Sequence, residues 1–166
     1  MSKFIARRTK AIISCSSKSK GIQVEMFKIP EQKILVIPNS IVSNNQLSEK
    51  NIPVHNESKF TIGYVGRFDK IKQLHLLVQL AIKMTKNKKN RFKIIMVGDG
   101  PEKNRIENSI QSNGLTEFFE LPGFVSAPEE YYRQFDCFIL PSFSEDFSLA
   151  LLEAGSWGIP CLAFDV

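Results

Sequence analysis

The chain has 166 residues, of which 43% are hydrophobic and 23% charged, and its formal net charge is +5 at pH 7. This length and composition are typical of a globular protein with one buried core, or with one domain and part of another. No apolar run is long enough for a membrane-spanning helix, and no continuous apolar segment follows the basic N-terminus. We therefore expect neither a membrane span nor a signal peptide.

The positive charge is concentrated near the N-terminus. Residues 1–50 contain nine Lys or Arg against three Asp or Glu, whereas residues 51–166 contain thirteen against fourteen. A nucleic-acid partner is not expected, because the basic residues are not interleaved with aromatic residues and form no known binding module. Two interpretations remain: a solvated surface, and peripheral contact with an anionic membrane.

The cysteines and histidines form no pattern typical of a metal or disulfide site. Cys15, Cys137 and Cys161 are far apart and odd in number, and His55 and His75 are isolated. We expect reduced, buried thiols in a cytoplasmic protein, with no bound metal and no cofactor.

The first 58 residues predict a helix, a short strand, a second helix, another strand and a loop. The strands are expected at residues 11–15 and 33–37, and the segment Ser16-Ser-Lys-Ser19 is expected to cap the helix between them. Residues 44–58 are polar and contain Pro53, so they are expected to form a loop or linker.

From residue 60 onward, apolar strands alternate with amphipathic helices. Strands are expected at residues 60–65, 91–97, 118–121, 136–140 and 159–164, with helices at 74–84, 101–112, 128–135 and 148–157. This alternation predicts an α/β fold with a doubly wound, parallel, Rossmann-like sheet, in which ligands bind at the carboxyl ends of the strands. Because the chain stops directly after a buried type of strand, we expect it to be a fragment.

Two cations, Arg67 and Lys72, follow the first of these strands. At the carboxyl edge of a parallel sheet they can neutralise a diphosphate, Arg67 through its planar guanidinium and Lys72 as a point charge. The alternative is a pair of solvated charges at the start of a helix.

A glycine-rich turn, Gly98-Asp99-Gly100, follows the next strand. It resembles a phosphate-binding loop, but the third glycine of a dinucleotide fingerprint is absent. A tight strand-to-helix turn that simply requires glycine explains the same residues.

The strongest candidate site lies between Glu145 and Glu153. Glu145 is expected in a loop, and Glu153 on the second turn of the following helix. The backbone N–H groups of Phe147, Ser148 and Leu149 would then lie at a helix N-terminus, which favours an anion. Because both oxygens of a carboxylate accept hydrogen bonds, Glu153 is suited to a ribose diol and Glu145 to sugar hydroxyls. The alternative for Glu153 is an ordinary exposed helix residue.

Together these motifs resemble the C-terminal, donor-binding domain of a GT-B glycosyltransferase of the family 4 type, also called glycosyl transferases group 1. The resemblance depends on the order and spacing of several short motifs. These motifs are Ile37-Pro-Asn-Ser40, Val65-Gly-Arg-Phe68 with Lys72, Val97-Gly-Asp-Gly-Pro101, Leu121-Pro-Gly-Phe-Val125, Asp136 with Leu140-Pro-Ser142, and Glu145 to Glu153 followed by Gly158-Ile-Pro160.

The resemblance implies a retaining glycosyltransferase, which transfers a hexose from a UDP-sugar or GDP-sugar to a glycan or lipid-linked acceptor without a metal. Arg67 and Lys72 would hold the diphosphate and Glu145 would contact the hexose, so these three residues are the implied catalytic group. No nucleophilic role is assigned to Glu145. Glu153 would bind the ribose. The other implied donor-binding positions are Gly66, Gly98, Phe124, Val125, Phe147, Ser148 and Leu149, with Phe124 and Val125 at the base.

The sequence departs from the family pattern at four positions. Asp146 and Ser148 stand where the family has glycine, Gln73 replaces the glycine after the lysine, and Ser40 replaces the glycine after Ile-Pro-Asn. These changes would alter donor choice or weaken donor binding, but they remove no proposed charged ligand.

The resemblance also divides the chain into residues 1–32, a remnant of the N-terminal acceptor domain, and residues 33–166, a partial nucleotide-sugar-binding domain. Because half a cleft cannot position two substrates, the isolated chain is expected to be inactive or nearly so. Two other functions stay open: a non-enzymatic module that binds nucleotide sugars, and a GT-B nucleotide-sugar epimerase. A cytoplasmic location, peripheral on the inner face of the membrane, is compatible with the resemblance.

Overall fold

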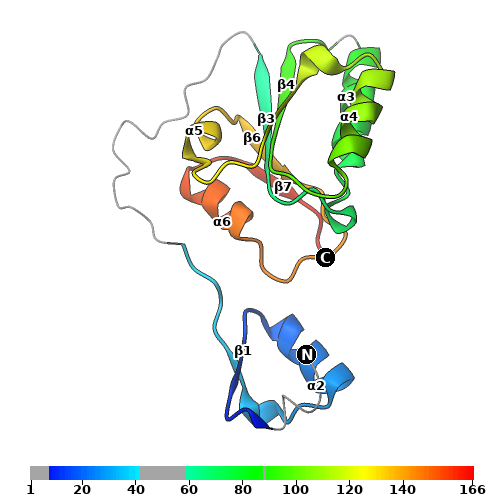
Figure 1. Cartoon of the computed structure of the whole chain (residues 1–166). Coiled ribbons are helices and arrows are strands. Elements are labelled where there is room, and N and C mark those ends of the chain that lie inside the picture. Colours follow the sequence, from blue (N-terminus) through cyan, green and yellow to red (C-terminus); the bar gives the residue numbers. More distant parts are fainter. Residues whose placement is uncertain (1–7, 42–58, 88) are drawn as a thin grey trace. The chain divides into compact units, whose positions relative to one another are not determined.

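The computed structural model describes residues 8–41, 59–87 and 89–166 (Figure 1). Contacts divide the chain into a first unit, Met1–Val42 with Glu145–Leu149, and a second unit, Ser43–Ser144 with Ala150–Val166. Most of the helix expected at the N-terminus and all of the loop expected at residues 44–58 lie outside the described residues. Within the described ranges, no helix has the length and apolar character that crossing a bilayer requires.

The first unit is a small α/β arrangement. Its elements are β1 (Ile12–Ser14), α2 (Ser17–Phe27), the 3-10 turn η1 (Glu31–Lys33) and β2 (Ile34–Val36). β1 and β2 pair in parallel, and the expected cap is present, because the Ser19 N–H donates to the Ser16 hydroxyl at 3.0 Å. In the described part of this unit, the buried hydrophobic core consists of Ile29 and Ile34.

The second unit is a five-stranded sheet with helices on both faces. In chain order its elements are β3 (Phe60–Val65), η3 (Lys70–Lys72), α3 (His75–Lys86), β4 (Phe92–Val97), α4 (Lys103–Ser112), η4 (Thr116–Phe118), β5 (Phe119–Gly123), α5 (Glu129–Tyr132), β6 (Cys137–Leu140), α6 (Leu149–Ser156, whose first residue belongs to the first unit) and β7 (Cys161–Ala163). The strand order is β5-β4-β3-β6-β7, and every pair is parallel. The α/β prediction is therefore confirmed.

The order of the strands places a change of direction in the middle of the sheet. From β3 the chain moves outward through β4 to β5, and it then returns to β6 and β7 on the other side of β3. Figure 1 shows α3 and α4 on one side of the sheet and α5 and α6 on the other. In doubly wound sheets, ligands bind at the carboxyl ends of the strands where this direction changes, which here is between β3 and β6.

The central strands are buried because they are apolar on both faces. In β4 the residues from Ile94 to Val97 are each at most 1% exposed, and in β3 the Tyr64 side chain is fully buried. At the start of β4, the ring of Phe92 stacks on Phe118 with 4.7 Å between centroids. This core fixes the strand ends from which the candidate site residues project.

The structure corrects three details of the sequence prediction. The cysteines are free but none is buried: Cys15 and Cys137 are half-buried and Cys161 is exposed. α5 covers only Glu129–Tyr132, because the N–H groups of Gln134 and Phe135 form i to i+3 bonds to the Tyr131 and Tyr132 carbonyls, which end the helix before β6. β7 was expected to be a buried strand, yet all three of its residues are exposed at the edge of the sheet.

The boundary between the two units also differs from the one expected at residues 32 and 33. β2 begins at Ile34 and pairs with β1, so the first unit continues to Val42. The boundary depends on which strand pairs with β2, and the apolar pattern of residues 33–37 does not identify that partner.

Candidate functional site at the carboxyl edge of the sheet

The segment after β3 carries the first expected cation. Gly66 has a φ of 155°, and its N–H donates to the Val97 carbonyl at 3.0 Å, so the chain leaves β3 alongside β4. The buried Tyr64 hydroxyl donates to the Arg67 carbonyl at 3.0 Å. The buried tyrosine therefore fixes the backbone of Arg67, while the Arg67 side chain is 70% exposed to solvent.

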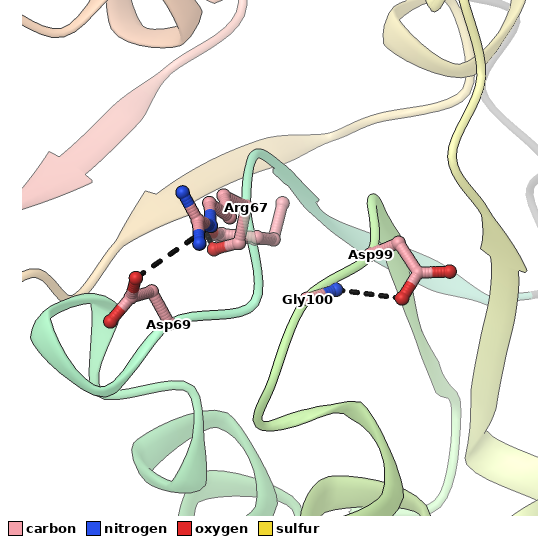
Figure 2. A network of polar contacts seen from close by, with 5 residues as sticks. Arg67, Asp69, Asp99 and Gly100 are labelled. Atoms are coloured by element: carbon pink, nitrogen blue, oxygen red, sulfur yellow. Dashed lines mark hydrogen bonds and ion pairs between the residues drawn. The ribbon is translucent and has the colours of Figure 1, made fainter.

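Arg67 has an acidic neighbour that the sequence analysis did not identify. Its Nε lies 3.7 Å from Asp69 Oδ2, and Figure 2 shows the two side chains facing each other across the turn. An exposed ion pair of this length contributes little to stability. A phosphate group offers the guanidinium two oxygens in a matching plane, so it can compete with Asp69 for Arg67.

Lys72 is the last residue of the 3-10 turn η3 and is half-buried. The Phe143 N–H, which follows β6, donates to the Ile71 carbonyl in the same turn at 2.8 Å. This bond joins the segments that leave β3 and β6, the two strands between which the sheet changes direction. The structure therefore places Arg67 and Lys72 at the edge where the fold predicts a ligand.

The glycines after β4 are required by close backbone packing. A Cβ atom added at Gly98 would lie 1.9 Å from the Gly66 carbonyl oxygen, and one added at Gly100 would lie 2.4 Å from the Phe68 carbonyl oxygen. The two loops are also bonded, because the Phe68 N–H donates to the Asp99 carbonyl at 2.8 Å. The tight-turn interpretation therefore explains both glycines, and a donor-binding role of Gly98 stays a prediction.

Asp99 stabilises this glycine turn through both of its carboxylate oxygens. Its Oδ1 accepts the Gly100 N–H at 2.7 Å, as Figure 2 shows, and its Oδ2 accepts Lys103 Nζ at 3.2 Å. The backbone hydrogen bond from Gly100, followed by that from Lys103, lowers the pKa of the Asp99 carboxyl. The carboxylate is thus engaged in shaping the loop.

The residues expected at the base follow β5, an outer strand of the sheet. The Phe124 side chain is 77% exposed, whereas Val125 packs against the core. Gly123 has a φ of 83°, a conformation that favours glycine and turns the chain just before Phe124. An exposed aromatic ring at a strand end is suited to stacking on a nucleobase, and this role stays a prediction.

Glu153 lies on the second turn of α6, as expected, but it is not a fully solvated residue. The Tyr132 hydroxyl on α5 donates to Glu153 Oε2 at 2.7 Å. Tyr132 is only 1% exposed. Nothing in the sequence spacing indicated this pair, because the two residues are joined only by the packing of α5 against α6.

The remaining expected positions, in Glu145–Leu149, belong to the first unit. Among them, Asp146 accepts hydrogen bonds from the Cys15 thiol at 3.0 Å and from the Ser16 hydroxyl at 2.7 Å. These bonds, the one from Cys15 first, lower the pKa of Asp146. The predicted roles of Glu145, Phe147, Ser148 and Leu149 therefore stay predictions from the sequence.

Comparison with known proteins identifies the family of this chain. A family model described as glycosyl transferases group 1 matches residues 45–166. The chain belongs to this family. The O-antigen biosynthesis glycosyltransferase WclY of Escherichia coli is 30% identical over 156 residues, which cover 89% of this chain and 42% of WclY. A second relative from Escherichia coli, UDP-Gal:alpha-D-GlcNAc-diphosphoundecaprenol alpha-1,3-galactosyltransferase, is 27% identical over 98% of this chain and 44% of its own length.

A solved structure shares the fold. The S. aureus TarM variant crystallised with fondaparinux, alpha-GlcNAc-glycerol and UDP superimposes with a TM-score of 0.81 at 23% identity, over 97% of this chain and 31% of TarM. The sheet and its helices are therefore part of a GT-B fold. The chain spans less than half the length of the relatives that it matches.

Proposed function

We propose that the protein to which this chain belongs is a retaining glycosyltransferase that transfers a hexose from a nucleotide-diphospho-sugar to a glycan or lipid-linked acceptor. The observation that carries the proposal is the placement of Arg67 and Lys72 where the sheet changes direction, in a chain of the glycosyl transferases group 1 family. Because the chain covers less than half of its relatives, transfer is proposed for the whole protein. For the chain itself we propose binding of the donor.

Arg67 and Lys72 have the charge that this reaction needs. When the bond between the sugar and the diphosphate breaks, negative charge develops on the leaving phosphate oxygen. Two fixed cations stabilise that charge at the moment it appears, Arg67 with a bidentate fork and Lys72 as a point charge. We propose that they do so without a divalent metal and that no other cofactor takes part.

The remaining predicted residues complete the proposed donor site. Glu153 would accept the ribose hydroxyls, and Glu145 would contact the hexose. Phe124 and Val125 would meet the base, and the N–H groups of residues 147–149 would face the phosphates. The donor is proposed to be a UDP-sugar or a GDP-sugar. UDP is present in the crystals of TarM, and UDP-galactose is named as the donor of one relative from Escherichia coli.

The same relative is named for a diphosphoundecaprenol-linked acceptor, a lipid. A lipid-linked acceptor would place the protein peripherally on the inner face of a membrane. The basic N-terminal segment is compatible with that place, since residues 1–50 carry nine Lys or Arg against three Asp or Glu. A non-enzymatic donor-binding module is the second candidate, because Asp146 and Ser148 replace glycines of the family pattern.

The test is a thermal titration of the chain with UDP, GDP and ADP, with and without EDTA. At 100 times Kd, a ligand stabilises the folded state by about 2.7 kcal/mol, which raises the Tm by about 5–10 °C for a chain of this size. Arg67→Ala should weaken binding of the preferred diphosphate by about 10-fold to 100-fold, the effect of one charged hydrogen bond. EDTA should leave the shift unchanged.

Arg105→Ala is the matched control. Arg105 is 71% exposed and pairs with Glu102 at 3.0 Å, much as Arg67 is 70% exposed and pairs with Asp69. Arg105 lies in the first turn of α4 and is not one of the predicted donor-binding residues, so its loss should leave the affinity unchanged. The proposal fails if no diphosphate shifts the Tm, or if both arginine variants lose affinity equally.

A further inference from the structure

Glu153 is held by a tyrosine from a neighbouring helix. Tyr132 ends α5, and its hydroxyl donates to Glu153 Oε2 at 2.7 Å, with a longer contact of 3.4 Å to the Ala150 carbonyl. Both helices lie on the same side of the sheet (Figure 1). One carboxylate oxygen of Glu153 is therefore engaged before any ligand arrives.

The other oxygen of Glu153 remains accessible. In the part of the chain that the structure describes, Oε2 is the carboxylate oxygen that accepts the hydrogen bond, and no protein donor reaches Oε1. Oε1 is also not among the buried side-chain atoms that lack a partner. An accessible oxygen beside an anchored one can accept from a ligand without losing a bond to the protein.

Tyr132 is a rigid anchor. Its ring meets Phe135 edge-on at 5.7 Å and lies tilted against Phe138 at 6.2 Å, and its side chain is 1% exposed. Burial, and then the hydrogen bond to Glu153, raise the pKa of the phenol far above its usual value. The hydroxyl therefore keeps its proton and remains a donor at neutral pH.

A second contact joins the same two segments. The Arg133 guanidinium lies over the Trp157 ring, which follows α6, with 5.4 Å between the Arg133 Cζ atom and the ring centroid. Tyr132 and Arg133 are neighbours, so the end of α5 contacts α6 at Glu153 and also contacts Trp157, the residue after α6. The hydroxyl of Tyr132 is thus fixed relative to the backbone of α6.

We propose that Tyr132 is a positioning residue that turns Glu153 toward the ribose of the donor. The phenol holds Oε2, and Oε1 accepts a ribose hydroxyl. A long glutamate side chain loses rotamer freedom when it binds a ligand, and an anchor that is already in place removes part of that cost. This inference rests on the proposed donor site, because it gives Glu153 the ribose.

The test compares ribonucleoside diphosphates with their 2′,3′-dideoxy analogues. Tyr132→Phe keeps the buried ring and removes only the hydroxyl. It should weaken binding of UDP, GDP or ADP, whichever the wild-type chain binds, by about 5-fold to 10-fold. Binding of the dideoxy analogue should be unchanged, since that analogue has no diol for Glu153 to accept. A variant that only loosened the fold would weaken both ligands equally.

Two further variants sharpen the result. Tyr131→Phe is the control, because Tyr131 packs against the core and its hydroxyl makes no hydrogen bond to the described residues. Its affinities should equal those of the wild type. Glu153→Asp shortens the arm by one methylene, so the carboxylate cannot reach both the fixed hydroxyl and the diol. This variant should lose the preference for ribose even if Tyr132→Phe does not fold.

The outcomes separate this inference from the proposed function. If the wild-type chain binds none of the three diphosphates, both fall. If it binds one of them with a preference for ribose that Tyr132→Phe and Glu153→Asp both retain, the donor site stands and the role of Tyr132 is overturned. Equal losses with the ribo and dideoxy ligands would also overturn it.

Discussion

Asp146 brings a carboxylate to a position where the family pattern has glycine. Inside the first unit its two oxygens accept from Cys15 and Ser16, and Ser16 also caps α2. The carboxylate therefore lies at the N-terminal end of α2, where the helix dipole favours negative charge. The added charge is thus met by polar partners within that unit.

The Cys15 thiol should report this contact. Its hydrogen bond to Asp146, followed by burial, raises its pKa above the ordinary value. Replacing the carboxylate in Asp146→Asn removes the charge that disfavours the thiolate, so the pKa of Cys15 should fall. At pH 8 more of the thiol is then ionised, and iodoacetamide should alkylate Cys15 at least about twofold faster.

Two other cysteines serve as controls in the same molecule. The pKa of Cys137 and that of Cys161 are raised chiefly by burial, with no contribution from Asp146. Mass spectrometry of the three alkylated peptides should show acceleration at Cys15 alone. Acceleration at all three would indicate loosening of the fold, and an unchanged rate at Cys15 would contradict the contact.

Single residues were predictable where the local pattern determines them. The position of Glu153 on the second turn of its helix follows from the apolar pattern and is confirmed, since α6 begins at Leu149. The partner of Glu153 was not predictable. Tyr132 lies 21 positions away, and only the packing of α5 on α6 brings its hydroxyl within 2.7 Å.

At the scale of elements, the strands were predicted best. The expected strand at residues 60–65 is β3, and the one expected at residues 91–97 is β4, which begins one residue later. Both are mainly apolar runs that are followed by a glycine, a signal contained in the local sequence. The end of α5 depends on the turn into β6, so its length was overestimated.

The residue after η3, Gln73, has a left-handed backbone conformation. Gln73 has a φ of 48° and a ψ of 39°, in the left-handed region where glycine is favoured. This is the position where the family pattern has glycine. A side chain there costs about 1 kcal/mol or more, whereas glycine adds about 0.4–1 kcal/mol of entropy to the unfolded state.

Gln73→Gly should therefore be neutral or stabilising by up to about 1 kcal/mol, as measured by urea unfolding. Gln79→Gly provides the comparison, because Gln79 is exposed in the middle of α3. That change should destabilise the protein by about 1 kcal/mol, the cost of glycine within a helix. Equal destabilisation by the two variants would show that Gln73 does not carry backbone strain.

For the whole molecule, the class of fold was predictable and the division into units was not. Alternating strands and helices predict a doubly wound parallel sheet, because apolar strands need helices on both faces. The boundary between the two units depends on which strand pairs with β2. The short run from Ile34 to Val36 suits either sheet by composition, and the structure pairs it with β1.

The two units differ greatly in the size of their cores. Among the residues that the structure describes, the hydrophobic core of the first contains Ile29 and Ile34, whereas that of the second contains 22 buried residues. A small core contributes little free energy of unfolding. The first unit should therefore unfold locally more readily than the second. Amide hydrogen exchange on the intact chain should therefore be fast in β1, α2 and β2 and slowest in β3 and β4.

Two isoleucine variants test whether each unit opens by itself. Ile94→Ala in β4 should cost about 2–5 kcal/mol and accelerate exchange by about 30-fold or more across the second unit. Ile34→Ala in β2 should accelerate exchange in the first unit and leave β3 and β4 unchanged, because its buried contacts lie in the smaller core. Slow exchange in β1 and β2 comparable to that of β4, or faster exchange in β4 caused by Ile34→Ala, would show one cooperative core in place of two.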